Sequence, residues 1–221
     1  MSFSLQTLYD TLLSAYGPQS WWPGETPFEV MIGAVLTQNT NWKNVEKAIE
    51  NLRREELLDP HSLYAIDTET LAELIRPAGY FNIKARRLHN LLKYIIDRHD
   101  GDLDAMFSCS LSTLREDLLS INGIGPETAD SILLYAGNLP TFVIDAYTYR
   151  VMTRHGWIEP EIDYHALQDH FLSNLPEDVA MYNEFHALFV QVGKNHCRKT
   201  PKCDGCPLVN LLPETGIVAP F

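Results

Sequence analysis

The stretch that decides the fold reads Leu118-Leu119-Ser120-Ile121-Asn122-Gly123-Ile124-Gly125-Pro126-Glu127-Thr128-Ala129. An amphipathic helix ends in a turn with two glycines, and a new helix begins with proline in its first turn, where a missing N–H costs nothing. Glycines allow another backbone to come close, and the N–H groups at a helix start suit a phosphate oxygen. We predict a phosphate-binding hairpin through Gly123, Ile124 and Gly125; the alternative is an ordinary helix–helix corner.

The hydrophobic pattern is helical nearly throughout the chain. In one segment the apolar residues recur at the spacing of a core-facing helix stripe: Leu88, Leu91, Leu92, Ile95 and Ile96. The apolar run from Thr141 to Ile144 is too isolated to build a sheet. The pattern therefore predicts an all-α chain with short connections.

Length and composition suit one substantial core or two smaller ones, since 45% of the 221 residues are hydrophobic. No apolar window is long enough to cross a bilayer, and the N-terminus lacks the basic start and apolar run of a secretion signal. We therefore expect a cytoplasmic monomer.

The net charge of −12 argues against a nucleic-acid partner, because phosphate binding favours a basic surface. Two segments depart from this average, since residues 82–98 and 194–202 each carry a net charge of +4. Asn82 is expected to cap a helix whose first turns hold basic residues, as at a helix start that faces phosphate. We predict phosphate contacts for Lys84, Arg86 and Lys194; solvated surface roles, or an acidic interaction protein without nucleic acid, are the alternatives.

A carboxylate follows the hairpin, where the apolar run Phe142-Val143-Ile144 leads into Asp145. Asp at this place is a preferred N-cap, and helix-terminal N–H groups hold a carboxylate ionised. An ionised carboxylate can also stabilise an oxocarbenium-like transition state while water attacks. Asp145 is therefore a candidate catalytic residue as well as a cap. The histidines show no ligand spacing, and we expect core or surface roles for His61, His89, His99, His155, His165, His170 and His186.

These motifs together resemble the endonuclease III family of helix-hairpin-helix DNA glycosylases. The matching segments are I-N-G-I-G-P-E-T-A followed by V-I-D-A-Y, L-T-Q-N-T at residues 36–40, and C-R-K-T-P-K-C-D-G-C at residues 197–206. The resemblance implies an all-α, two-domain fold with a cleft between the domains that receives a flipped base. Residues 25–139 would form the middle domain with the hairpin, and residues 1–24 plus 140–221 the second domain.

The resemblance also implies site roles. Asp145 takes the position of the catalytic carboxylate, and Gln38 takes the position that fills the gap left in the duplex, unless Gln38 is solvated or satisfied in the core. The implied partner is double-stranded DNA with a damaged base, in a nucleoid of the prokaryotic type. A DNA-binding module without catalysis is the alternative.

Two departures from the family's motifs bear on which reactions this protein is expected to catalyse. Glu127 stands where strand-cutting members carry a Schiff-base lysine, and a carboxylate cannot replace an amine nucleophile, so strand cleavage should be absent or weak. Gly33 stands where the adenine-mismatch relatives carry a glutamate, so adenine excision is not expected.

Aromatic residues add a second resemblance, to the monofunctional 3-methyladenine branch. Trp21-Trp22-Pro23, Trp42 after L-T-Q-N-T, and Glu127 carry it. Indole faces can select a cationic alkylated purine, so Trp22, Trp42, Gln38 and Glu127 are the predicted base-pocket and gap residues, with a core role as the alternative for the tryptophans. Trp21 and Trp157 are expected in the core. Oxidised pyrimidines or mismatched uracil or thymine are the alternative substrates.

The cysteine segment resembles the family's iron–sulfur loop except at its end. Three cysteines crowd together at Cys197, Cys203 and Cys206, but Leu212 stands where the fourth ligand is expected. The three thiolates could hold a [4Fe–4S] cluster with His196 or an exchangeable fourth ligand, or zinc with His196. A loop without metal is the third alternative.

Overall fold

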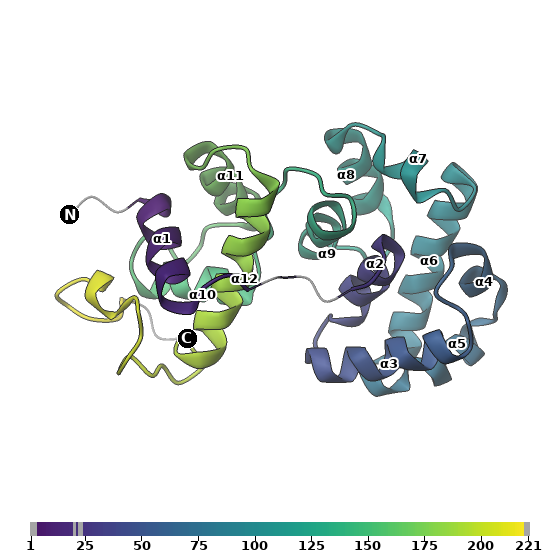
Figure 1. The fold of residues 1–221 in the computed structure, drawn as a ribbon, viewed down its shortest axis with the longest axis horizontal. Helices are drawn as coiled ribbons and strands as arrows, with labels where there is room; N and C mark the ends of the chain where they lie inside the picture. Colours follow the sequence, from purple (N-terminus) through teal and green to yellow (C-terminus); the bar gives the residue numbers. More distant parts are fainter. Residues whose placement is uncertain (1–3, 20, 22–23, 219–221) are drawn as a thin grey trace. The chain divides into compact units, whose positions relative to one another are not determined.

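In the computed structural model, residues 4–19, 21 and 24–218 are described. The chain divides into two compact units, which we call the hairpin unit (Trp22–Leu139) and the carboxylate unit (Met1–Trp21 with Pro140–Phe221). Every regular element in the described ranges is helical, so the prediction of an all-α chain is confirmed (Figure 1). None of the described helices is long and apolar enough to cross a membrane.

The hairpin unit consists of one long helix, α6, and several shorter helices. Its elements are α2 (Pro27–Leu36), α3 (Trp42–Arg54), α4 (Pro60–Ala65), α5 (Thr68–Leu74), η1 (Arg76–Ala78), α6 (Phe81–His99), α7 (Leu103–Phe107), α8 (Leu111–Ser120), α9 (Pro126–Ser131) and the π-helical turn η2 (Ile132–Ala136).

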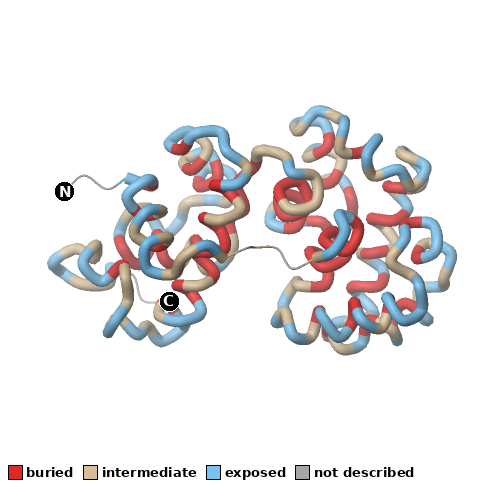
Figure 2. Tube along the Cα trace, in the orientation of Figure 1, coloured by how far each residue is buried: buried red, intermediate tan, exposed pale blue. Residues whose placement is uncertain are grey.

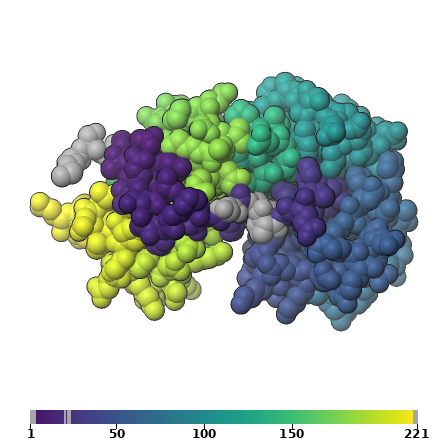
Figure 3. All heavy atoms as spheres, in the orientation of Figure 1, coloured from purple at the N-terminus to yellow at the C-terminus, as the bar shows by residue number. Residues whose placement is uncertain are grey.

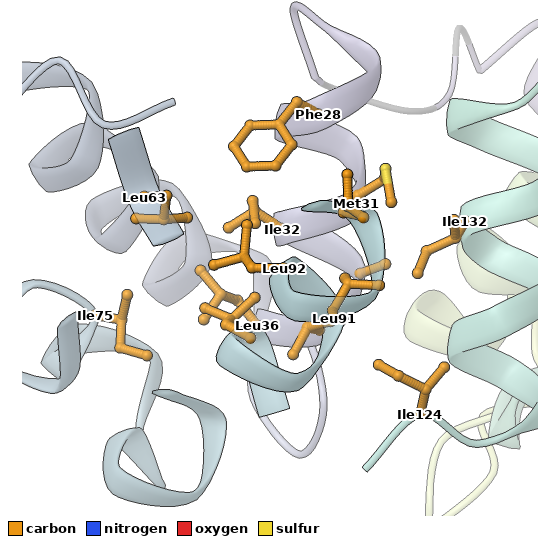
Figure 4. Close-up of a cluster of buried hydrophobic side chains, with 14 of the residues drawn as sticks. Phe28, Met31, Ile32, Leu36, Leu63, Ile75, Leu91, Leu92, Ile124 and Ile132 are labelled. Atoms are coloured by element: carbon orange, nitrogen blue, oxygen red, sulfur yellow. The ribbon is translucent and has the colours of Figure 1, made fainter. Parts of the chain in front are cut away.

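Helix α2 forms the centre of this unit, because every residue from Phe28 to Leu36 is buried. Its apolar side chains pack against those of α6 and of the segment that follows α8 (Figure 4). The exception in its sequence, Glu29, is 5% exposed and accepts a hydrogen bond of 2.9 Å from Arg53 on α3. A helix that is apolar on all sides requires burial on all sides, and the surrounding helices provide it (Figure 2).

Helix α6 carries the predicted core stripe, but it begins two residues earlier than the pattern suggested. Leu88, Leu91, Leu92 and Ile95 are fully buried, and Ile96 at the end of the stripe is half-buried. The prediction of Asn82 as N-cap is wrong, because Tyr80 occupies that position with a φ of 48° and no side-chain cap. Asn82 lies inside the first helical turn.

The position of the Lys84 side chain contradicts the prediction that it contacts phosphate. Its side chain is buried, with 1% exposure, and Nζ donates to the carbonyls of Leu36 at 2.7 Å and Ala78 at 2.8 Å. Burial lowers its pKa to about 8, and the charge of Arg87 adds to this effect. A buried ammonium that joins the ends of α2 and η1 cannot reach a phosphate, so the prediction for Lys84 is wrong.

The carboxylate unit combines the start of the chain with its last third. Its elements are α1 (Leu5–Tyr16), α10 (Ala146–Arg154), α11 (Tyr164–Asn174), α12 (Val179–Asn195) and η3 (Val209–Leu211). Helix α1 (purple) and the C-terminal segment (yellow) belong to this same unit (Figure 3). Leu5, Leu8 and Leu12 bury the inner face of α1, which packs against α12.

An aromatic cluster fills the core of the carboxylate unit. The core of the hairpin unit, by contrast, consists mainly of aliphatic side chains. Phe142 stacks on Phe171 with ring centroids 4.2 Å apart, and Phe185 stacks on Phe189 at 4.9 Å. Such rings bury large areas in fixed geometry. The run that holds Phe142 is buried but forms no strand within the described residues, and it ends at the start of α10.

Candidate functional site

The predicted hairpin is present as α8, a tight turn and α9. The turn closes through the Ile124 N–H, which donates to the Ile121 carbonyl at 3.0 Å. The side chains of both isoleucines are buried in the core, so Ile124 can offer only its backbone to a ligand. Helix α9 begins with Gly125 as N-cap and Pro126 in the first turn, as the local pattern predicted.

The two glycines of the turn serve different needs. Gly123 has a φ of 99°, and a Cβ there would lie 2.3 Å from Cγ of Arg87. It is required both by backbone conformation and by a close neighbour. Gly125 has an extended backbone, and nothing lies within 4 Å of the place where its Cβ would stand. The space in front of Gly125 is therefore open to a ligand.

A buried ion pair joins the two helices of the hairpin. Arg115 on α8 holds Asp130 on α9 through two hydrogen bonds, from Nε to Oδ1 at 2.8 Å and from Nη2 to Oδ2 at 3.0 Å. The Asp130 side chain is fully buried and that of Arg115 is 21% exposed. Bidentate pairs of this kind fix geometry as well as charge. The hydrophobic pattern of the sequence did not identify this pair.

Gln38 lies against the hairpin. Its Nε2 donates to the Gly123 carbonyl at 3.2 Å and to Thr128 Oγ1 at 2.9 Å, and its Oε1 accepts from Arg87 Nη1. The side chain is half-buried. The loop that carries Gln38 and the hairpin turn thus form one hydrogen-bonded network within the hairpin unit.

A basic groove lies beside the same turn. It is open and is lined by Thr68, Ile83, Arg86, Arg87, His89, Asn90, Asn122 and Gly123. Asn90 donates to the Asn122 carbonyl at 2.9 Å and so holds the turn at the edge of the groove. Arg86 is exposed, which is compatible with its predicted role. Arg87, one of the basic residues predicted at this helix start, contributes the second guanidinium.

Asp145 is the N-cap of α10 in the carboxylate unit. Its Oδ1 accepts from the Thr148 N–H at 2.7 Å and from Thr148 Oγ1 at 3.0 Å, and its Oδ2 lies 3.5 Å from His186 Nε2. The Asp145 side chain is 11% exposed and that of His186 is 6% exposed. The local pattern predicted the cap, but the histidine was expected to have only a core or surface role. His186 is buried, as a core role requires, and in addition it faces the candidate catalytic group.

The environment of Asp145 keeps it ionised. Burial is the largest single influence and raises the pKa, but the electrostatic interaction with the nearby His186 and the hydrogen bonds from His186 and Thr148 together lower it by more. The pKa therefore lies below the ordinary value for Asp. A carboxylate that stays charged while mostly removed from water can stabilise a nearby positive charge strongly.

The other predicted pocket residues have mixed surroundings. Trp42 is half-buried at the start of α3 and packs against the core of the hairpin unit, while Glu127 is exposed in the first turn of α9. Trp22 lies outside the described residues. Trp21 and Trp157 are half-buried rather than enclosed in the core. Lys194, predicted to bind phosphate, is exposed and lies over the Trp21 ring at 5.6 Å.

The three clustered cysteines line one cavity. Cys197, Cys203 and Cys206 share it with His196 and Leu212. Burial raises the pKa of the Cys206 thiol, and the nearby Cys203 and Cys197 raise it further. In the described ranges no group of three or more His, Cys, Asp or Glu side chains is arranged to hold a metal ion. Because the apolar Leu212 lines the cavity at the expected fourth position, the donor set does not fit a cluster held by four cysteines.

Two arginines of α10 hold the cysteine loop from inside the protein. Arg154, which is 2% exposed, donates to Cys197 Sγ at 3.3 Å and to the carbonyls of Arg198 at 2.6 Å and Lys199 at 2.9 Å. Arg150 Nε donates to the Cys197 carbonyl at 2.6 Å. The loop that displays the basic segment 194–202 is therefore anchored by protein groups.

Comparison with known proteins identifies the family. The model of the HhH-GPD superfamily of base excision DNA repair proteins matches residues 32–177, which include Gln38, the hairpin and Asp145. The chain belongs to this superfamily. A Methanocaldococcus jannaschii protein with the provisional name DNA repair glycosylase is 50% identical over 203 residues, covering 91% of this chain and 92% of its own. Endonuclease III of Thermotoga maritima is 29% identical, over 83% of this chain and 81% of its own.

Solved structures of HhH-GPD proteins have the same fold. A 3-methyladenine DNA glycosylase of H. pylori, bound to 1,N6-ethenoadenine, superimposes with a TM-score of 0.76 at 31% identity, over 87% of this chain and 98% of that one. A non-covalent complex of endonuclease III with DNA gives a TM-score of 0.80 at 24% identity, over 95% and 94% of the two chains. The protein is therefore an endonuclease III-like DNA repair glycosylase of the HhH-GPD superfamily.

Proposed function

We propose that this protein is a monofunctional DNA glycosylase that hydrolyses the N-glycosidic bond of an alkylated purine flipped from double-stranded DNA, and that it acts as a monomer. Asp145 carries the proposal. Its buried, ionised carboxylate suits stabilisation of the oxocarbenium-like sugar while water attacks the anomeric carbon. The base departs with the bonding electrons, and the product is an abasic site. An Asp that serves only as an N-cap, as in a DNA-binding module without catalysis, requires no second partner such as His186 at Oδ2.

The absence of strand cleavage follows from Glu127. An imine with the abasic sugar requires an amine, and the first turn of α9 offers a carboxylate at the position where the lysine is expected. We therefore propose that lyase activity is absent or weak.

The substrate class rests on aromatic residues and on one relative. Alkylation makes a purine cationic and a good leaving group, and indole rings such as Trp42 attract such a base. The H. pylori protein of similar fold is a 3-methyladenine DNA glycosylase. The alternative substrate is an oxidised pyrimidine or mismatched uracil or thymine, since other relatives carry the name endonuclease III and not that of a 3-methyladenine glycosylase.

We assign the DNA backbone to the groove beside the hairpin and to the basic loop. Arg86 and Arg87 give the groove its positive charge, Gly123 of the hairpin turn lines it, and the space in front of Gly125 is open to a ligand. Lys194 adds a cation in the carboxylate unit. This local charge offsets the net charge of −12.

Base release from three duplexes tests the function, with 3-methyladenine, thymine glycol or uracil as the single lesion. We expect release from the 3-methyladenine duplex, strand cleavage only after alkali, and no adduct trapped by borohydride. Spontaneous nicking with a trapped adduct would contradict the interpretation of Glu127. If base is released only from the thymine glycol or the uracil duplex, the substrate belongs to the alternative class and is not an alkylated purine.

Gly125→Ala tests the hairpin as a phosphate site. The new methyl group points into open space, so we expect little change in stability but binding to abasic-site duplex weakened about tenfold or more, because it blocks close approach. Gly123→Ala is the matched contrast: positive φ and the contact with Arg87 predict about 1–3 kcal/mol of lost stability. Thermal unfolding and fluorescence anisotropy separate the two effects. Unchanged DNA binding by Gly125→Ala would remove the hairpin from the interface.

For the cysteine loop we propose a [4Fe–4S] cluster with three cysteine ligands first, zinc second and a metal-free loop third. That Cys197, Cys203 and Cys206 line one cavity favours a metal, whereas Leu212 and the lack of a metal-holding arrangement among the described residues argue against full ligation. Any metal would order the loop, and no catalytic step depends on it. A visible absorption band with iron analysis distinguishes the cluster, since zinc and empty forms are colourless.

A further inference from the structure

His186 lies on α12, beside the candidate catalytic residue Asp145. It is a buried titratable side chain to which neither the family motifs nor the hairpin assign a task. Its Nε2 lies 3.5 Å from Asp145 Oδ2, while Thr148 on α10 binds Oδ1 through two donors. The two carboxylate oxygens therefore have different partners, from two different helices.

The separate partners of the two carboxylate oxygens affect how firmly Asp145 is oriented for catalysis. A carboxylate bound only through Oδ1 can rotate about its Cβ–Cγ bond, and rotation moves Oδ2 relative to a reacting sugar. A second contact at Oδ2, from a helix that packs closely on α10, removes that freedom. Small misplacements of a catalytic group cost large factors in rate.

We propose that His186 is a positioning residue: its Nε2 holds Oδ2 of Asp145, and with Thr148 at Oδ1 it fixes the orientation of the catalytic carboxylate before DNA binds. The inference rests on the proposed role of Asp145. His186 itself does not touch substrate. It acts through the carboxylate, and its proximity also lowers the pKa of Asp145.

Three charged groups on the helices packed around His186 have other partners. Glu184 on α12 accepts from the Gln19 N–H at 2.7 Å, Arg150 on α10 donates to the Cys197 carbonyl, and Asp10 on α1 accepts from Gln6. From α11 the aromatic ring of Phe171 packs against Phe185. The pH dependence of Asp145 should therefore reflect His186 above other groups.

Two substitutions test the proposal by single-turnover base release. His186→Leu removes the donor at similar volume, and we expect release to slow about 10–100-fold with DNA affinity unchanged. The acidic limb of its pH profile should move to higher pH, because burial of Asp145 then acts with less opposition. His186→Gln restores an N–H donor and should recover most of the rate. His170→Leu is the control, a histidine of the same unit whose ring packs against Phe171.

A double-substitution cycle separates this inference from the proposed function. If His186 acts through Asp145, adding His186→Leu to Asp145→Asn should slow release no further. Multiplied losses in the double variant, or an unshifted acidic limb in His186→Leu, would overturn the positioning role while leaving Asp145 catalytic. A full rate in Asp145→Asn alone would refute the proposed function itself. Should His186→Leu fail to fold, the pH profile of His186→Gln decides.

Discussion

Asp145→Asn should release base about 10²–10³-fold more slowly than the natural protein, because the negative charge beside the developing oxocarbenium ion is lost. Asparagine caps helices as well as aspartate does, so α10 should keep its N-cap and the fold its stability. The change therefore isolates charge from structure. Single-turnover base release, with enzyme in excess over lesion duplex, measures the chemical step.

Asp163→Asn provides the matched control for this result. Asp163 caps α11 in the same unit through the Ala166 N–H at 2.8 Å and has no histidine partner among the ion pairs of the described residues. Its substitution makes the same chemical change at a helix start and should leave the rate unaltered. Equal rates for Asp145→Asn and the natural protein would reduce Asp145 to a cap and favour a DNA-binding role without catalysis.

Arg115→Ala is expected to destabilise the hairpin unit by about 3–5 kcal/mol, since it leaves the fully buried Asp130 carboxylate without its bidentate partner. The substitution also removes the ion pair that holds α8 against α9. DNA binding should therefore weaken together with the loss of stability. Urea unfolding followed by circular dichroism measures the change.

Arg76→Ala is the control for Arg115→Ala. The Arg76–Glu73 pair has a similar distance, 3.1 Å, but both side chains are more than half exposed, at 61% and 64%. Exposed pairs contribute at most about 1 kcal/mol. Comparable losses in the two variants would mean that burial of Asp130 does not govern the stability of the hairpin.

Local features of this protein could be predicted from its sequence. The apolar stripe of α6, the turn at Gly123, and the N-cap at Asp145 each depend on residues within a few positions of one another. Helix periodicity, glycine conformation and capping act over that range, so they are readable without the fold. The ordered motifs also indicated the family to which the comparisons assign the chain.

Contacts between side chains that are far apart in the sequence depend on the tertiary structure. Lys84 looks like a phosphate ligand in sequence but is buried between the carbonyls of Leu36 and Ala78, and His186 looks unremarkable but faces Asp145 across two helices. Which helix faces meet depends on packing of whole elements, and burial then determines whether a charge meets water, a carbonyl or a carboxylate. The residues near one another in the sequence determined each helix, cap and turn. The electrostatic role of each buried side chain was determined by the packing of the helices, because packing sets which groups surround it.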